Sequence, residues 1–155
     1  MMQKGTILGD RYELHERLGE GGMGAVWIAR NIAVGGAEVA VKVMHANLAT
    51  DTLAVERFRN EASIAARIGH PNIVRVFDFG RGEDGAPYMA MERLHGESLA
   101  ARLEREGSLP PKDGARLVIT VLEALAAAHA LDVLHRDLKP ENIFLAREEI
   151  GRAHV

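Results

Sequence analysis

The first part of the chain alternates short apolar and β-branched runs with turns marked by glycine, a pattern typical of an antiparallel sheet. One segment, residues 52–68, instead carries its apolar residues at helical spacing, with N-cap candidates at residues 50–52 and a Gly-His-Pro stop at residues 69–71. We therefore expect one helix in that segment. The five expected strands cover residues 12–19, 25–30, 38–44, 73–79 and 87–92.

From Leu94 onward the apolar spacing becomes helical. A short helix is expected over residues 98–106 and a long one over residues 112–131, separated by a Gly-Ser-Leu-Pro-Pro break. The residues after Phe144 indicate a strand, a charged turn and the start of a returning strand. The predicted fold class is α+β: a five-stranded antiparallel lobe with one helix over residues 1–92, then a helical part over residues 93–155. A ligand cleft is expected where the two parts join.

Composition and charge exclude several classes of protein. The 155 residues are 47% hydrophobic and 26% charged, as in a globular protein, and a net charge of −3 argues against a nucleic-acid-binding surface. The chain has no cysteine, which excludes disulfides, thiol catalysis and Cys-based zinc sites and fits a reducing compartment. Its first residues contain no apolar signal-peptide region. We therefore predict a cytoplasmic location.

The longest apolar stretch, residues 117–134, is interrupted by Glu123, His129 and Asp132, so it predicts a buried helix rather than a membrane segment. Its polar residues form only a thin stripe, and most of the helix circumference is apolar. The short helix at residues 98–106 is too small to cover such a surface. An exposed apolar patch is therefore expected, with a possible partner covering residues 117–134.

Gly19, Gly21 and Gly24 have the spacing G-x-G-x-x-G. Such glycines allow a strand-turn-strand segment to lie close over phosphates, with backbone N–H groups directed at the anion. A dinucleotide-binding fingerprint is excluded, because it requires a helix after the glycines and the residues AVWIA continue as a strand. A simple tight turn remains the alternative.

Lys42 lies in the apolar strand AEVAVKVM, in phase with Ala40 and Met44. If that face of the strand is buried, the ammonium group needs an anion. Glu61 falls within the apolar stripe of the following helix, and an inward carboxylate is costly unless it is paired. We therefore expect Lys42 and Glu61 to form an ion pair.

The segment HRDLKPEN, residues 135–142, carries the strongest signal in the chain. Asp137 offers a carboxylate to accept a proton, Lys139 a cation for a phosphoryl group, and Asn142 an amide oxygen for a metal ion. This combination points to phosphoryl transfer.

The filling and order of these motifs resemble those of the eukaryotic-type protein kinases, in particular the Ser/Thr kinases of bacteria, over nearly the whole chain. The resemblance implies ATP and Mg²⁺ as cofactors and a protein substrate that offers a Ser or Thr hydroxyl. It implies Asp137 as the catalytic base, Lys139 as a second catalytic residue and Asn142 as a magnesium ligand. The nucleotide-binding residues that it implies are Leu18, Gly19, Gly21, Gly24, Val26, Ala40, Lys42, Glu61, Met91, Glu92, Leu94 and Phe144.

The family pattern next requires a D-F-G motif, whose Asp binds the principal magnesium, and an activation segment. After Phe144-Leu145 these 155 residues contain neither. We therefore expect a domain truncated after its catalytic loop. Loss of one metal-binding Asp costs on the order of 10²-fold in rate or more, so the 155-residue chain is expected to be nearly inactive.

Two other functions stay open at this point. A non-catalytic nucleotide-binding or interaction module, similar to a pseudokinase, would keep the glycine loop and Lys42 and use the apolar helix to contact a partner. A small-molecule phosphotransferase of the antibiotic-kinase type shares the two-lobed plan, but the complete segment RDLKPEN argues against it.

Overall fold

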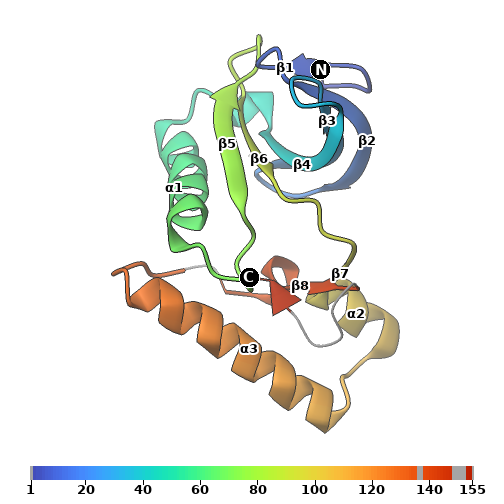
Figure 1. The fold of residues 1–155 in the computed structure, drawn as a ribbon, viewed down its shortest axis with the longest axis vertical. Coiled ribbons are helices and arrows are strands. Elements are labelled where there is room, and N and C mark those ends of the chain that lie inside the picture. Colours follow the sequence, from blue (N-terminus) through green and yellow to red (C-terminus); the bar gives the residue numbers. More distant parts are fainter. Residues whose placement is uncertain (1, 136–137, 148–152, 155) are drawn as a thin grey trace. The chain divides into compact units, whose positions relative to one another are not determined.

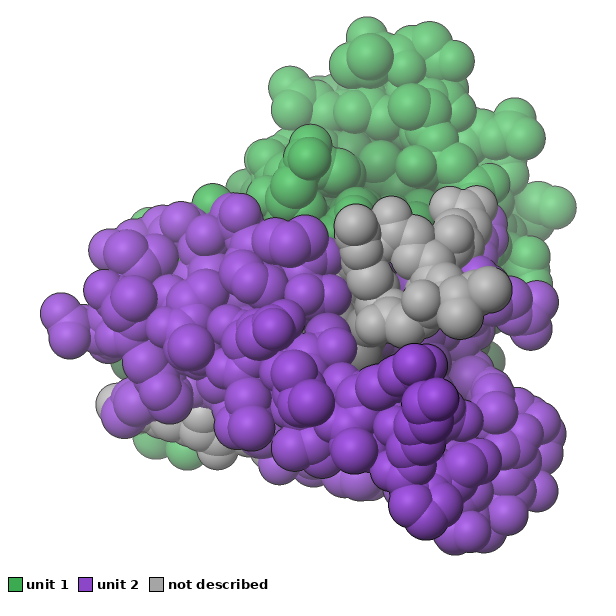
Figure 2. All heavy atoms as spheres, turned by 60° about the horizontal axis from the view of Figure 1, so that its bottom comes forward, with its two compact units in different colours: residues 1–66, 75–93 green, residues 67–74, 94–155 purple. Residues whose placement is uncertain are grey.

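The computed structural model describes residues 2–135, 138–147 and 153–154. The fold consists of two compact units. The first comprises Met1–Ala66 and Arg75–Arg93, and the second comprises Arg67–Val74 and Leu94–Val155 (Figure 2). The predicted division at residue 92 differs from these units chiefly at residues 67–74, which belong to the second unit.

The first unit is a six-stranded antiparallel sheet with the strand order β1-β2-β3-β4-β6-β5 and one long helix, α1 (Figure 1). The six strands, rather than the five expected, arise because β1 is only two residues long and too short to show an alternating pattern. The strands are β1 (Ile7–Leu8), β2 (Tyr12–Glu20), β3 (Gly24–Asn31), β4 (Ala37–Met44), β5 (Val76–Arg81) and β6 (Pro87–Met91).

The sheet of the first unit has two apolar faces, because side chains alternate along each strand. One face is packed with the cluster Leu8, Tyr12, Leu14, Trp27, Ala29, Val39, Val41, Val43, Ala86, Tyr88 and Ala90. On the other face, Met44 and Met89 of the sheet pack against Phe58 and Ala62 of α1. The even-numbered residues of β4 lie on this second face, which is where Lys42 is placed.

Helix α1 (Thr52–Ile68) begins and ends where the sequence predicts. Asp51 accepts hydrogen bonds from the backbone N–H groups of Leu53 and Ala54, which satisfies two donors of the first turn. Gly69 follows the helix with φ of +55°, a conformation that glycine adopts without steric cost. A short 3-10 helix, η1 (Ala46–Leu48), connects β4 to this cap.

The second unit contains the helices α2 (Leu99–Glu106) and α3 (Pro111–His129), the 3-10 helix η2 (Pro140–Asn142) and a three-stranded sheet. That sheet has the order β7-β8-β9, formed by β7 (Gly96–Ser98), β8 (Phe144–Ala146) and β9 (Ala153–His154). The antiparallel pairing of Phe144 with His154 confirms the predicted returning strand. The core of this unit contains Leu99, Val121 and Ile143.

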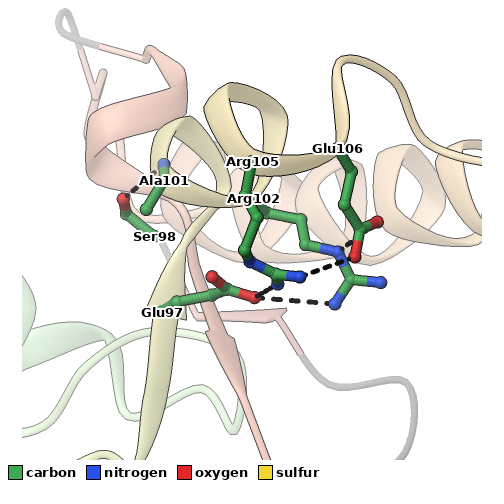
Figure 3. Close-up of polar contacts among 6 residues, drawn as sticks. All are labelled: Glu97, Ser98, Ala101, Arg102, Arg105 and Glu106. Atoms are coloured by element: carbon green, nitrogen blue, oxygen red, sulfur yellow. Dashed lines mark hydrogen bonds and ion pairs between the residues drawn. The ribbon is translucent and has the colours of Figure 1, made fainter.

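An ion-pair network lies along one side of α2 (Figure 3). Ser98 caps the helix by accepting a hydrogen bond from the backbone N–H of Ala101 at 3.1 Å. Glu97, just before the cap, pairs with Arg102 and Arg105, and both arginines also pair with Glu106 at the last turn. These exposed pairs connect the beginning of the helix to its end.

One side of α3 is exposed and apolar. Val118, Ile119 and Leu122 are each more than half exposed, whereas Val121 and Ala124 are buried. The expectation of an apolar patch on this helix therefore agrees with the exposure of these side chains. Among the helices that the structure describes, none is long and apolar enough to cross a membrane.

Candidate active site

Lys42 and Glu61 form an ion pair in the first unit. The Lys42 Nζ atom donates a hydrogen bond to Glu61 Oε1 at 3.0 Å. The same ammonium group lies 5.8 Å from the centre of the Phe58 ring, within the range of a cation–π contact. The structure thus brings together the strand lysine and the helix glutamate that the burial argument paired.

The predicted burial of Glu61 is wrong. Its side chain is 53% exposed, and that of Lys42 is 23% exposed. The buried stripe of α1 passes through Phe58 and Ala62, and Glu61 lies beside it rather than within it. A long side chain at the edge of a helix face reaches a partner on the sheet while its carboxylate stays hydrated, so the pair forms without the cost of a buried charge.

Four of the residues expected to contact the nucleotide share one face of the sheet with α1. Val26 lies opposite Lys42 in the β3–β4 ladder, and Ala40 lies opposite Met91 in the β4–β6 ladder. Directly opposed residues of antiparallel strands point to the same side. Because Ala40 and Lys42 are two positions apart, all four side chains lie on that side of the sheet.

The three glycines near the β2–β3 turn, Gly19 in β2, Gly21 in the turn and Gly24 at the start of β3, have different surroundings. A Cβ atom on Gly24 would lie 2.1 Å from the backbone oxygen of Val43, so glycine is required there for β3 to approach β4. A Cβ atom on Gly19 would have no neighbour within 4 Å, and one on Gly21 would meet only the Gly24 oxygen at 4.0 Å. Leu18, just before this segment, is 44% exposed. Gly19 and Gly21 therefore leave open space beside the backbone, as an approaching ligand requires.

The candidate hinge residues lie at the end of β6. The Glu92 N–H donates to the Arg75 oxygen at 2.9 Å, and the Glu92 carboxylate accepts from the Arg75 N–H at 2.8 Å. Two hydrogen bonds thus continue the pairing of the two strands beyond the sheet. Leu94, two positions further along, belongs to the second unit.

The catalytic-loop candidates that the structure describes belong to the second unit. Asp137 lies outside the described residues, as does Arg136. Lys139 and Asn142 are exposed at the two ends of η2, where the Asn142 N–H donates to the Lys139 oxygen at 2.9 Å. Phe144 lies on β8 opposite Ser98. The buried Ile143, whose oxygen accepts from the Leu99 N–H at 2.7 Å, fixes this segment to α2.

The tripeptide Asp78-Phe79-Gly80 also spells D-F-G, but it precedes HRDLKPEN in the chain and lies on β5. The Asp78 carboxylate accepts hydrogen bonds from Arg11 at 3.1 Å and from the Tyr12 hydroxyl at 3.0 Å. Burial, and then the hydrogen bond to Asp78, raise the pKa of Tyr12. Asp78 is therefore part of the packing of the sheet, and the tripeptide is not the metal-binding motif of the family.

Two further observations complete the site. Within the described ranges, no group of three or more His, Cys, Asp or Glu side chains could hold a metal ion. His45 contacts the glycine connection, with Nε2 2.9 Å from the Gly21 oxygen, and sequence reasoning missed it. The two residues are 24 positions apart, and no local pattern connects them.

Comparison with known proteins gives the same family at the level of sequence and of structure. The protein kinase domain family matches residues 12–151. A probable serine/threonine-protein kinase of Corynebacterium efficiens is 42% identical over 142 residues, which are 90% of this chain and 21% of that protein. The serine/threonine-protein kinase pkn3 of Myxococcus xanthus is 43% identical over 141 residues, which are 91% of this chain and 26% of that protein.

The solved structures include the crystal structure of the PknI kinase domain of Mycobacterium tuberculosis. It matches with a TM-score of 0.79 and 29% identity over 100% of this chain and 61% of that chain. The chain therefore belongs to the protein kinase family, and its named relatives are serine/threonine-protein kinases of bacteria. It spans about a fifth to a quarter of the length of these relatives. The α+β kinase fold expected from the motifs is confirmed.

Proposed function

We propose that this chain provides the nucleotide-binding lobe and the catalytic loop of an ATP-dependent protein serine/threonine kinase. The observation that carries the proposal is the Lys42–Glu61 ion pair, on the sheet face that also presents Val26, Ala40 and Met91. Family membership supports it independently. The open space at Gly19 and Gly21 leaves room for phosphates beside backbone N–H donors.

In this proposal the first unit binds ATP. Lys42, oriented by Glu61, binds the α- and β-phosphates, and the glycine connection covers the phosphate groups. The adenine ring contacts apolar side chains and the backbone after β6. The proposed nucleotide contacts are Leu18, Gly19, Gly21, Gly24, Val26, Ala40, Lys42, Glu61, Met91, Glu92, Leu94 and Phe144.

The second unit provides the chemistry in the proposal. Asp137 accepts the proton of a Ser or Thr hydroxyl as its oxygen attacks the γ-phosphorus, and Lys139 stabilises the transferred phosphoryl group. The amide oxygen of Asn142 is a hard ligand that suits Mg²⁺. When bound, Mg²⁺ neutralises charge on the phosphate oxygens. The supply of ATP and the reducing environment that a cysteine-free chain fits favour the cytoplasm as the place of action.

Binding of Mg²⁺-ATP by the purified chain tests the proposal. We expect a saturable increase in melting temperature with Mg²⁺-ATP that Lys42→Met abolishes, because the variant removes the cation while keeping an apolar stem. The matched control is Lys112→Met, which removes an equal charge from the exposed first turn of α3. An equal shift in wild type and Lys42→Met would overturn the assignment of Lys42, and no shift in the wild type would overturn the proposal.

The same purified proteins can be assayed for phosphoryl transfer. These 155 residues contain no D-F-G after the catalytic loop, so we expect transfer from γ-labelled ATP to a protein substrate to be slower than in a complete kinase domain by about 10²-fold or more. Transfer at the rate of a complete domain that Asp137→Asn abolishes would contradict this expectation.

A non-catalytic interaction module is the second candidate function. The observation that favours it is the exposed apolar side of α3, where Val118, Ile119 and Leu122 form a surface suited to a protein contact. In that case Mg²⁺-ATP would bind and stabilise the first unit while transfer stayed undetectable. Mutation of the α3 surface would then abolish partner binding without changing the nucleotide-dependent shift.

A further inference from the structure

His45 contacts the turn between β2 and β3 from the end of β4. Its Nε2 atom lies 2.9 Å from the Gly21 oxygen, and its backbone N–H donates to the Met23 oxygen at 3.0 Å. The turn itself is closed by a hydrogen bond from the Gly21 N–H to the Gly24 oxygen at 2.9 Å. A single residue thus holds two carbonyl groups of the glycine turn, residues 21–24.

The contact of His45 with the Gly21 oxygen determines the direction of the Gly22 N–H group on the turn. A trans peptide unit is planar, so its C=O and the following N–H point in opposite directions. With the Gly21 oxygen directed at His45, the Gly22 N–H points away from His45. A Cβ atom at Gly22 would have no neighbour within 4 Å, so the backbone beside this donor is open. Outward N–H groups on such a turn are suited to bind an anion.

The charged group facing the imidazole is the carboxylate of Glu20. Its Oε1 atom lies 3.7 Å from His45 Nε2, and its Oε2 atom accepts from Arg17 at 2.8 Å. The side chain of His45 is 30% exposed and that of Glu20 is 50% exposed, so water screens this pair but does not remove it. Glu20 therefore bridges the imidazole of His45, just after β4, to the Arg17 side chain on β2.

The protonation state of His45 determines the strength of the contact. A protonated imidazole donates from both nitrogens, so it donates to the Gly21 oxygen and attracts Glu20. A neutral imidazole with its proton on Nε2 also donates to that oxygen, but without the positive charge that strengthens the hydrogen bond.

We propose that His45 is a positioning residue for the phosphate-binding turn, and that the charge-assisted contact of a protonated His45 with the Gly21 oxygen, beside Glu20, increases the affinity for Mg²⁺-ATP. This inference rests on the proposed function, in which the glycine turn contacts the phosphates. His45 itself does not touch the reacting atoms and acts through the direction of the Gly22 N–H.

The test compares Mg²⁺-ATP affinity from about pH 5.5 to pH 8 in the wild type, His45→Gln and His15→Gln. Glutamine keeps a neutral donor but cannot titrate. His15 is a matched control because it lies on β2, with Nε2 3.5 Å from Glu13, away from the turn. Relative to His45→Gln, we expect the wild type and His15→Gln to gain about two- to fivefold in affinity at the acid end, a magnitude typical of an exposed charged pair. Titration of ATP itself is common to all three proteins and cancels in the ratio.

A ratio of wild-type to His45→Gln affinity that stays constant with pH would overturn the inference, as would an equal effect of His15→Gln. Backbone amide exchange of the turn in the nucleotide-free chain distinguishes this failure from that of the proposed function. We expect the turn to be more protected at low pH in the wild type than in His45→Gln, after correction for intrinsic exchange. If that difference is present but the chain does not bind Mg²⁺-ATP, the proposed function fails and the link to nucleotide affinity fails with it. If that difference is absent, the contact does not order the turn and the inference is wrong.

Discussion

The glycines in and beside the β2–β3 turn show that one residue type serves two purposes within six positions. At Gly24 a side chain would overlap the Val43 oxygen at 2.1 Å, and backbone atoms cannot move aside without breaking the β3–β4 ladder. At Gly21 the space is open, and its φ is not in the left-handed region, so alanine fits the backbone. Gly24 is therefore required for the fold of the sheet, whereas Gly21 leaves space for a ligand.

We expect Gly24→Ala to lower the free energy of unfolding of the first unit by about 2 kcal/mol or more, because it forces an overlap within the sheet. Gly21→Ala should change stability by less than about 1 kcal/mol and still weaken Mg²⁺-ATP binding, because its Cβ occupies the space beside the turn. Urea unfolding followed by the fluorescence of Trp27, which is buried in this unit, measures the two changes in stability. The increase in melting temperature with Mg²⁺-ATP measures the change in binding. Equal stability losses in the two variants would contradict this assignment.

Helix α2 is short, and its ends are connected by charged side chains rather than by a large buried surface. Only Leu99 is buried among its residues, while Arg102 pairs with Glu106 at 2.7 Å and both arginines reach Glu97. Hydrogen bonding from Arg102 is the main cause that lowers the pKa of Glu106. Isolated helices of this length are marginal in water, so the cap and the ion pairs contribute to its formation.

The lowered pKa of Glu106 gives a pH dependence with a definite sign. A carboxyl whose pKa is lower in the folded state stabilises that state above its unfolded value of 4.5, and the contribution is lost as pH falls through the folded value. We expect Glu106→Gln to reduce amide-exchange protection of α2 at pH 6 and to converge with the wild type below about pH 4. Glu104→Gln, on the same exposed helix, is the matched control. A difference that persists unchanged at acid pH would contradict the role of this pair.

At the scale of the whole molecule, the apolar side of α3 is an exposed surface suited to association. Val118, Ile119 and Leu122 are 55%, 57% and 57% exposed. Leu122 lies one turn after both Val118 and Ile119, on the same side of the helix. We expect the purified chain to self-associate with increasing concentration, and Ile119→Glu with Leu122→Glu to suppress association with little loss of stability. Sedimentation velocity measures the first effect and urea unfolding the second. Val121→Glu, at a buried position, should instead unfold the second unit. A wild-type chain that stays monomeric at high concentration would contradict the expected self-association.

Most elements could be predicted because their signals are local. The bounds of α1 follow from its cap and stop residues, and β2, β3, β4 and β6 follow from apolar runs between turns. Strand β1 was missed because two residues show no period. The pairing of Gly96 with Ala146 was missed for a different reason: the two residues are far apart in the chain, and a Cβ at Gly96 would lie 1.9 Å from the Leu145 oxygen, which only the folded sheet reveals.

The candidate site, too, could be predicted only in part from the sequence. The contact of Lys42 with Glu61 could be expected because two charged residues in apolar patterns each require a partner. The exposure of Glu61 could not, because the angle between a helix and a sheet determines whether a side chain at the edge of a stripe reaches solvent. The roles assigned to all site residues, Lys42 and Glu61 included, stay proposals.

By itself, then, the amino-acid sequence determined the family, most of the elements and the residue types of the candidate site, since these depend on local spacing and on motif filling. Tertiary structure alone decided which distant residues meet. It placed His45 against the Gly21 oxygen, engaged Asp78 with Arg11 and Tyr12, and left one side of α3 exposed. The physical reason is that such contacts depend on strand register and helix packing, which are set by the summed burial of many side chains rather than by any one segment.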